Sequence, residues 1–277
     1  MEQKCLLAVY AHPDDEVFGS GGVLRKYSDE GVRTALICAT RGEAGEIADP
    51  ALATPETLAR VREGELRASC RILGIADLIV LGYHDGRLAE VDALEAQGRL
   101  VCELRRLRPQ VVVTFDAAGV YGHPDHRAIH RLTVGAFHQA GDPTCYPEQI
   151  AGGRQPYAPQ KLYVTASSQS SMRQTRALVL AAGYTYALGG NAATLALEEM
   201  GTPDDEITTC ITLSDREYAA KLEALRAHRT QISPTSYWLR MPDELRPVRG
   251  VERFVLLYPP GAPTDQSETD LFLGVRL

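Results

Sequence analysis

The stretch from Cys5 to Gly22, CLLAVYAHPDDEVFGSGG, constrains the fold of this chain more than any other. Its apolar start, Cys5 to Ala11, favours a buried parallel strand. Pro13 has no backbone N–H and ends that strand. One imidazole and three carboxylates lie within the five residues His12 to Glu16, and a glycine-bearing run then leads into a helix. Open α/β folds keep their active sites at the C-terminal ends of such strands.

Strand and helix patterns alternate through the first half of the chain. The apolar runs and helical periodicities predict strands at 5–11, 32–40, 78–81 and 111–115, separated by helices at 17–30, 55–73, 91–107 and 124–140. Further strands are predicted at 161–166, 207–213 and 251–257, with a helix from a capping box at Ser214 and Glu217 to about residue 230. Such alternation is typical of right-handed βαβ crossovers. We expect a Rossmann-like, doubly wound, mostly parallel sheet with helices on both faces and C-terminal additions.

The chain of 277 residues contains no linker that would divide it, and we expect a single domain over 1–277. Its core is expected at 1–140. The remainder, 141–277, is expected to hold a lid loop and C-terminal α/β elements. The lid is placed at 141–160, where Pro, Gly, Tyr and Gln accumulate. The stretch 167–203 shows no clean periodicity, and no element is predicted there.

Composition excludes several classes of partner. The net charge of −7 comes without any basic block, so nucleic acid is a poor candidate ligand. The apolar run near the N-terminus is too short for a signal peptide or a membrane span. Six cysteines without a CxxC pair indicate a reducing, cytoplasmic location. A small-molecule partner is expected. A homo-oligomer stays open, because no interface can be identified from the sequence.

Two similar motifs follow two of the predicted strands. One runs from His12 to Glu16 after the first strand, and the other is His123-Pro-Asp125-His126 after the fourth. In a sheet of order 3-2-1-4-5, strands 1 and 4 are neighbours at the point where the winding reverses. Their C-terminal loops then form one cleft. The sequence therefore predicts that the two motifs converge.

Histidine and aspartate without cysteine suit zinc or a similar divalent ion. Three protein ligands and an open position for water would make such a site catalytic. His12 and Asp15, three residues apart, face one side of a helical turn. His126, on the first turn of the helix that starts near Pro124, is a sensible third ligand. An alternative leaves His126 on the surface and gives its place to His123.

The remaining charged residues of the two motifs can then act on the reaction. Asp14 is displaced from the metal and could take a proton from a bound water whose pKa the metal lowers to about 7. In the first arrangement His123 could face the substrate carbonyl as a positively charged donor.

These residues also carry a family resemblance. AHPDDE and YGHPDH, together with TRGEAGE (40–46) and AHRTQ (227–231), resemble the LmbE-like (PIG-L) zinc de-N-acetylases. That family includes the deacetylases of the N-acetylglucosamine conjugates that lead to mycothiol, bacillithiol and glycosylphosphatidylinositol. The resemblance extends from residue 5 to about residue 231.

The resemblance implies a role for each matching residue. One zinc ion per chain would be held by His12, Asp15 and His126. Asp14 would activate water and later protonate the leaving amine, His123 would stabilise the oxyanion and Tyr121 could polarise the carbonyl. Asp125 would orient an imidazole. Arg62 and Asp85 would contact the sugar conjugate.

The sequence thus predicts a zinc-dependent hydrolase that removes the N-acetyl group from an N-acetylglucosamine-type conjugate. An amidase on another amide-bearing conjugate, of the S-conjugate type, is an alternative on the same site. A metal-dependent phosphoesterase would need further carboxylates or phosphate-binding glycines. A non-catalytic sugar-binding module would not need two His/Asp motifs at one cleft.

Overall fold

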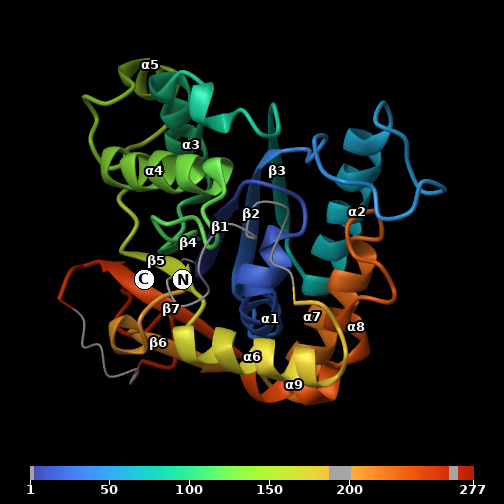
Figure 1. The fold of residues 1–277 in the computed structure, drawn as a ribbon. Helices are drawn as coiled ribbons and strands as arrows, with labels where there is room; N and C mark the ends of the chain where they lie inside the picture. Colours follow the sequence, from blue (N-terminus) through green and yellow to red (C-terminus); the bar gives the residue numbers. More distant parts are fainter. Residues whose placement is uncertain (1–2, 187–200, 262–267) are drawn as a thin grey trace.

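The structure is a computed structural model that describes residues 3–186, 201–261 and 268–277. Its strands form one sheet of order β3-β2-β1-β4-β5-β7-β6 (Figure 1). The strands are β1 (Cys5–Tyr10), β2 (Arg33–Thr40), β3 (Asp77–Tyr83), β4 (Val111–Thr114), β5 (Lys161–Ala166), β6 (Thr209–Thr212) and β7 (Val251–Tyr258). The predicted order 3-2-1-4-5 and the predicted α/β class are both confirmed.

The centre of the sheet is parallel. β1 pairs with β2 on one side and with β4 on the other, and every residue of β1 is buried. A strand covered on both faces needs apolar side chains throughout, which is why its sequence shows no alternation. The crevice between the ends of β1 and β4 is therefore the switch point of the winding.

Helices cover both faces of the sheet (Figure 1). α1, α2 and α7 pack against one another on one face, and α3 packs on α4 on the other. The helices of the described residues are α1 (Asp15–Asp29), α2 (Leu58–Leu73), α3 (Ala93–Leu107), α4 (Pro124–Gln139), α5 (Pro147–Ala151), α6 (Gln169–Ala181), α7 (Asp215–Ala227), α8 (Tyr237–Arg240) and α9 (Pro242–Arg249). In the part of the chain that the structure describes, none of them is long and apolar enough to cross a bilayer.

Helix α1 is interrupted at Ser20, whose φ of −155° is not helical. The second half of the helix therefore has its own unpaired N-terminal amides. Glu252 of β7 accepts from two of them, Gly22 N at 2.9 Å and Val23 N at 2.7 Å. The same carboxylate bonds the buried ammonium of Lys221 at 2.6 Å. The C-terminal strand thus fixes the helix that begins with the first motif.

The C-terminal additions are partly antiparallel. β7 runs antiparallel to both β5 and β6. Within 167–203, where no element was predicted, α6 forms from 169 to 181, and 187–200 lies outside the described residues.

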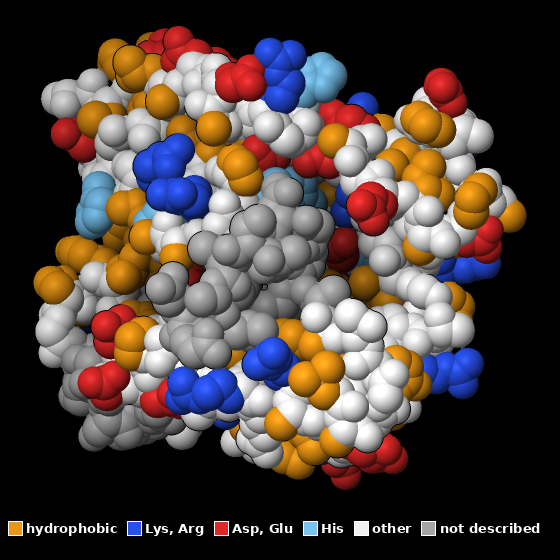
Figure 2. All heavy atoms as spheres, viewed as in Figure 1, with side chains coloured by type: hydrophobic (Ala, Val, Ile, Leu, Met, Phe, Trp, Pro, Cys, Tyr) orange, Lys and Arg blue, Asp and Glu red, His pale blue; other side chains and the backbone are white. Residues whose placement is uncertain are grey.

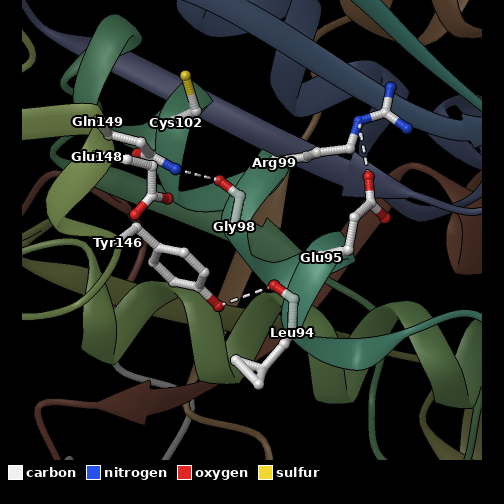
Figure 3. Close-up of a pocket in the computed structure, with 8 residues that line it drawn as sticks. All are labelled: Leu94, Glu95, Gly98, Arg99, Cys102, Tyr146, Glu148 and Gln149. Atoms are coloured by element: carbon white, nitrogen blue, oxygen red, sulfur yellow. Dashed lines mark hydrogen bonds and ion pairs between the residues drawn. The ribbon is translucent and has the colours of Figure 1, made fainter. Parts of the chain in front are cut away.

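The prediction of a lid at 141–160 is wrong. The amides of Gln160 and Lys161 donate to the carbonyl of Gln110, which precedes β4, so the segment ends at the opposite edge of the sheet from the motifs. Buried Arg105 of α3 fixes its start by donating to the backbone carbonyls of Ala140, Asp142, Cys145 and Tyr146. The segment instead borders an open pocket of about 420 Å³ on α3, lined by Leu94, Glu95, Gly98, Arg99, Cys102, Tyr146, Glu148 and Gln149 (Figure 3).

Candidate metal centre

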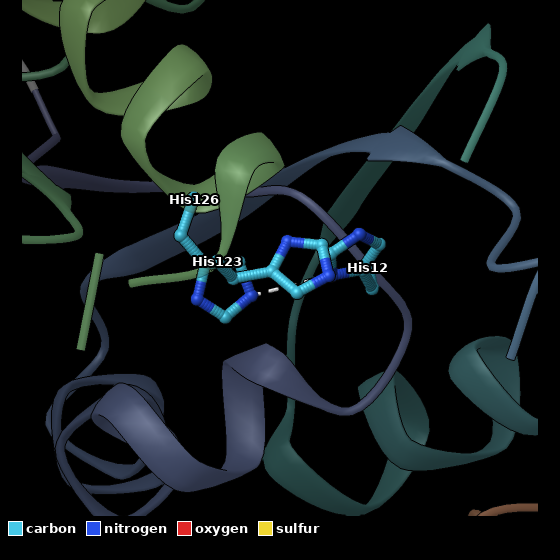
Figure 4. Close-up of side chains that lie close together, drawn as sticks. All are labelled: His12, His123 and His126. Atoms are coloured by element: carbon cyan, nitrogen blue, oxygen red, sulfur yellow. Dashed lines mark hydrogen bonds between the residues drawn. The ribbon is translucent and has the colours of Figure 1, made fainter. Parts of the chain in front are cut away.

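The two motifs converge at the C-terminal edge of the parallel strands. His12 comes from the loop after β1, while His123 and His126 come from the start of α4 (Figure 4). Their rings lie with centroids 4.7 to 5.2 Å apart. On the face drawn in Figure 2, histidine, acidic and basic side chains are visible close to one another just above the middle of the view.

Three side chains bring their ligand atoms together at this edge. His12 Nδ1 lies 3.3 Å from Asp15 Oδ2 and 3.3 Å from His126 Nε2. Asp15 Oδ1 lies 3.4 Å from His126 Nε2. Two ligand atoms that are each about 2.0–2.1 Å from one tetrahedral zinc ion are separated by about 3.3–3.4 Å. The residues present therefore fit a tetrahedral metal with three protein ligands.

The other nitrogen of each imidazole is held by an oxygen acceptor. His126 Nδ1 lies 3.3 Å from the carbonyl of Gly119, and its ring stacks on Phe115. His12 Nε2 lies 3.0 Å from Asp85 and 3.2 Å from Asp125. Such acceptors place the proton on the nitrogen that faces away from the metal and leave the inner nitrogen bare. Both rings thus turn their inner nitrogens toward each other, and Asp125 contacts the imidazole of His12.

The carboxylates around His12 favour a positive charge there. Burial opposes charge on the ring, but Asp125, Asp15 and Asp85 raise the pKa of His12 well above its ordinary value. Asp15 shows the converse shift. Its burial is outweighed by His126 and His12, which hold the pKa of its carboxyl far below the usual range. The same negative charges would stabilise a bound divalent cation.

Two other groups at this edge could also hold a metal. One replaces Asp15 by His123, and the other combines His12 with Asp85 and Asp125. In the first, His123 Nδ1 already accepts the Asp125 amide at 3.2 Å, so its Nε2 carries the proton. In the second, both carboxylates also accept backbone amides. The alternative of a surface His126 is wrong, because only 2% of that residue is exposed.

Asp14 occupies an unusual backbone conformation beside the ligands. Its φ is 106° and its ψ is −26°, in the left-handed region that non-glycine residues rarely adopt. Burial raises the pKa of its carboxyl to about 6, although the neighbouring Arg62 lowers it. A half-buried carboxylate of raised pKa next to a candidate metal site suits proton transfer near neutral pH.

Arg62 was predicted to contact the substrate, and in the structure the contacts of its guanidinium are all within the protein. Only 3% of the residue is exposed. Its guanidinium donates to the carbonyls of Gly42 at 2.6 Å and Pro13 at 2.7 Å, and lies 3.2 Å from Asp14 Oδ2. A Cβ at Gly42 or Gly45 would lie 2.3 or 2.5 Å from this guanidinium. Arg62 therefore joins the loops that follow β1 and β2.

Asp85 was also predicted to contact the sugar, and it too is engaged within the protein. Its Oδ1 faces His12 Nε2, and its Oδ2 accepts the amide of Ala44 at 3.0 Å. Its side chain is 8% exposed. The structure therefore gives Asp85 the same task as Asp125, the orientation of His12.

His123 and Tyr121 both lie at the site. Burial, together with the imidazoles of His12 and His126, lowers the pKa of His123 to about 4. This lowered pKa favours a neutral ring over the positively charged donor expected from the sequence. Tyr121 packs its ring edge-on against His126 and His123.

Glu16 and His228 form a buried pair that sequence analysis did not identify. His228 Nε2 lies 2.7 Å from Glu16 Oε1, with 0% and 1% of the side chains exposed. Burial opposes charge on His228, but Glu16 raises its pKa. The available signal in the sequence was the AHRTQ motif at 227–231, which contains this histidine.

Comparisons with known proteins place the chain among related sequences. Residues 7–137 match the family described as PIG-L: GlcNAc-PI de-N-acetylase. Two relatives bear the name 1D-myo-inositol 2-acetamido-2-deoxy-alpha-D-glucopyranoside deacetylase. The relative from Thermobispora bispora is 34% identical over 99% of this chain and 100% of its own length. The relative from Salinispora arenicola is 36% identical over 99% of this chain and 92% of its own length.

The fold also occurs among solved structures. N,N'-diacetylchitobiose deacetylase from Pyrococcus horikoshii, solved with an inhibitor, superposes with a TM-score of 0.68. The match covers 99% of this chain and 87% of that one, at 24% identity. At that identity the likeness supports the fold alone.

Proposed function

We propose that this chain, which belongs to the PIG-L family of GlcNAc-PI de-N-acetylases, is a zinc-dependent hydrolase of N-acetylglucosamine conjugates. Family membership rests on relatives that are more than 30% identical over almost the whole chain. Because these relatives are named as deacetylases, we assign this chain as an N-deacetylase. The inositol conjugate in those names is the first substrate to test. The observation that carries the proposal is the convergence of three side chains. His12 Nδ1 and His126 Nε2 lie 3.3 Å apart, and each lies 3.3 to 3.4 Å from one oxygen of the Asp15 carboxylate.

His12, Asp15 and His126 would hold the metal. When bound, zinc would polarise the acetyl carbonyl and make water a better nucleophile at neutral pH. The residues of the chain then divide the remaining work. Asp14 takes the proton of the attacking water and returns a proton to the amine as the carbon–nitrogen bond breaks, giving acetate and a free amino sugar.

The oxyanion would be stabilised by neutral donors. His123 Nε2–H is available because Nδ1 accepts a backbone amide. Tyr121, whose pKa is raised chiefly by burial, stays protonated at neutral pH and can donate its hydroxyl to the same carbonyl. Donors fixed in place before the reaction stabilise developing charge at little reorganisation cost.

The test is acetate release from a panel of N-acetylglucosaminyl inositol, N-acetylglucosaminyl malate and chitooligosaccharides, with a phosphate ester as control. Purified protein should contain one zinc per chain, lose activity to a chelator and recover it on adding zinc. Zinc-loaded protein that releases acetate from none of them would point to another amide substrate. Hydrolysis of the phosphate ester instead would overturn the deacetylase proposal.

A further inference from the structure

The carboxylate of Glu16 lies directly behind Asp14. Only 1% of Glu16 is exposed. Its Oε2 accepts the backbone amide of Asp14 at 2.9 Å. Its Oε1 accepts from Ser69 Oγ at 2.5 Å and faces His228 Nε2 at 2.7 Å. One buried side chain thus connects the main chain of Asp14 to α2 and to the residue after α7.

The bond to the Asp14 amide has a specific consequence. A non-glycine residue in the left-handed region costs on the order of 1–3 kcal/mol and persists only where its surroundings impose it. Glu16 holds the amide of this strained residue, and Arg62 holds its carboxylate. The direction in which Asp14 presents its carboxylate therefore depends on both contacts.

Glu16 itself cannot move to accommodate a change at Asp14. Ser69 is fully buried in α2, and His228 is fully buried at the end of α7. Among the described residues, His228 Nδ1 has no hydrogen-bond partner, so the ring is directed by its contact with Glu16. A buried carboxylate with every oxygen engaged is a rigid support.

We propose that Glu16, anchored by Ser69 and His228, is a positioning residue that fixes the turn at Asp14 and so sets the rate of proton transfer. The inference rests on the proposed role of Asp14 as general base. It also gives His228 a function, as the anchor of Glu16.

The first experiment compares Glu16→Ala with Glu65→Ala. Glu65 is the matched control because it also joins α2 to the segment after α7, accepting from Thr230 N at 2.8 Å and Thr230 Oγ1 at 2.6 Å, and it is not bonded to Asp14. Glu16→Ala should lower kcat at least 10-fold, with KM and zinc content unchanged. Glu65→Ala should keep kcat within about 2-fold. Equal kcat values in the two variants, or loss of zinc with Glu16, would overturn the proposal.

A second measurement separates positioning from general destabilisation. In an Asp14→Ala background, adding Glu16→Ala should lower kcat no further, because Glu16 acts through Asp14. The amide proton of Asp14 should exchange with solvent faster in Glu16→Ala than in the wild-type protein. An additive loss of kcat, or unchanged exchange, would contradict the inference.

Two further variants keep the test decisive. Glu16→Gln retains an acceptor for the Asp14 amide and should recover most of kcat. If Glu16→Ala does not fold, Ser69→Ala loosens Glu16 without removing it and should lower kcat about 3- to 10-fold at constant KM. Wild-type kcat in Ser69→Ala would then count against the proposal. Full activity in Asp14→Ala would instead refute the proposed function.

Discussion

At the scale of single residues, adjacent positions in one motif have different tasks. Asp15 points at the two imidazoles, Asp14 stands apart in a strained turn, and Glu16 is buried behind both. The division of Asp14 from Asp15 could be predicted from spacing, since only one of them shares a face with His12. The role of Glu16 could not, because its partners Ser69 and His228 are far away in the sequence.

The first prediction concerns that division. Asp14→Ala should keep its zinc and lose about 10²–10⁴-fold in kcat, the usual contribution of a positioned acid–base group. His12→Ala should lose the zinc itself. Metal analysis and kcat, measured on the same preparations, check both.

His84→Ala is the control, because the side chain of His84 is 82% exposed. It should change neither metal content nor rate. If Asp14→Ala stripped the zinc while hydrolysis persisted, the assigned roles would have to be exchanged.

At the scale of elements, the sequence predicted the parallel core well and the additions poorly. The strands β1, β2, β4 and β5 are mostly buried runs rich in apolar residues, and such runs are visible without tertiary context. α6, α8 and α9 pack their apolar residues on one another in a small separate cluster, so their sequence carries no pattern matched to the sheet. The lid was misplaced because composition indicates a loop and does not indicate at which edge of the sheet it lies.

The bond between β7 and α1 gives the second prediction. Glu252→Ala should destabilise the fold by about 3–5 kcal/mol, because it leaves the Lys221 ammonium buried without its partner. It also removes the acceptor of two helix amides. Chemical unfolding measures the change. Glu244→Ala, on the exposed side of α9, should stay within about 0.5 kcal/mol of the wild type.

The ion pair that joins β2 to β3 gives a prediction on pH. Hydrogen bonds from Arg33 to Asp77, at 2.8 and 2.9 Å, lower the pKa of the Asp77 carboxyl. A carboxyl with a lowered folded-state pKa stabilises the fold above its unfolded pKa of about 3.9, and this contribution is lost as the pH falls through the folded pKa.

Asp77→Asn should therefore cost about 0.5 kcal/mol at pH 7, a typical value for a partly exposed pair. The difference in free energy of unfolding between variant and wild type should shrink below about pH 4. Denaturant titrations at several pH values test this. A difference that stayed constant with pH would assign the effect to hydrogen bonding and not to charge.

At the scale of the whole molecule, the proposed ligands lie in the first half of the chain, and two buried residues that hold Glu16 and α1 lie in its C-terminal third. The three proposed metal ligands lie between residues 12 and 126, inside the matched family segment 7–137. His228 and Glu252, which hold Glu16 and α1, lie beyond it. The sequence could predict where the ligands converge, but not that the C-terminal third supports them.

A chain that ends at residue 140 tests this dependence. It keeps His12, Asp15 and His126 but loses β5, which pairs with β4, and the buried contacts of α7 with α1 and α2. We expect it to unfold without a cooperative transition and to bind zinc at least 10-fold more weakly. Circular dichroism during thermal unfolding and metal titration provide the readouts. Cooperative unfolding with wild-type zinc affinity would show that 1–140 is sufficient.

The guanidinium of Arg62 occupies the space that side chains at 42 and 45 would need. These three positions should therefore covary among related chains. A chain with a short side chain at 62 has room for alanine at 45 if the side chain at 231 also gives way, whereas one with arginine at 62 requires glycine. Position 42 should stay glycine whatever residue stands at 62, because its φ of +68° favours glycine. Its relatives should rarely combine arginine at 62 with a side chain at 45, however far the rest of their sequences have diverged.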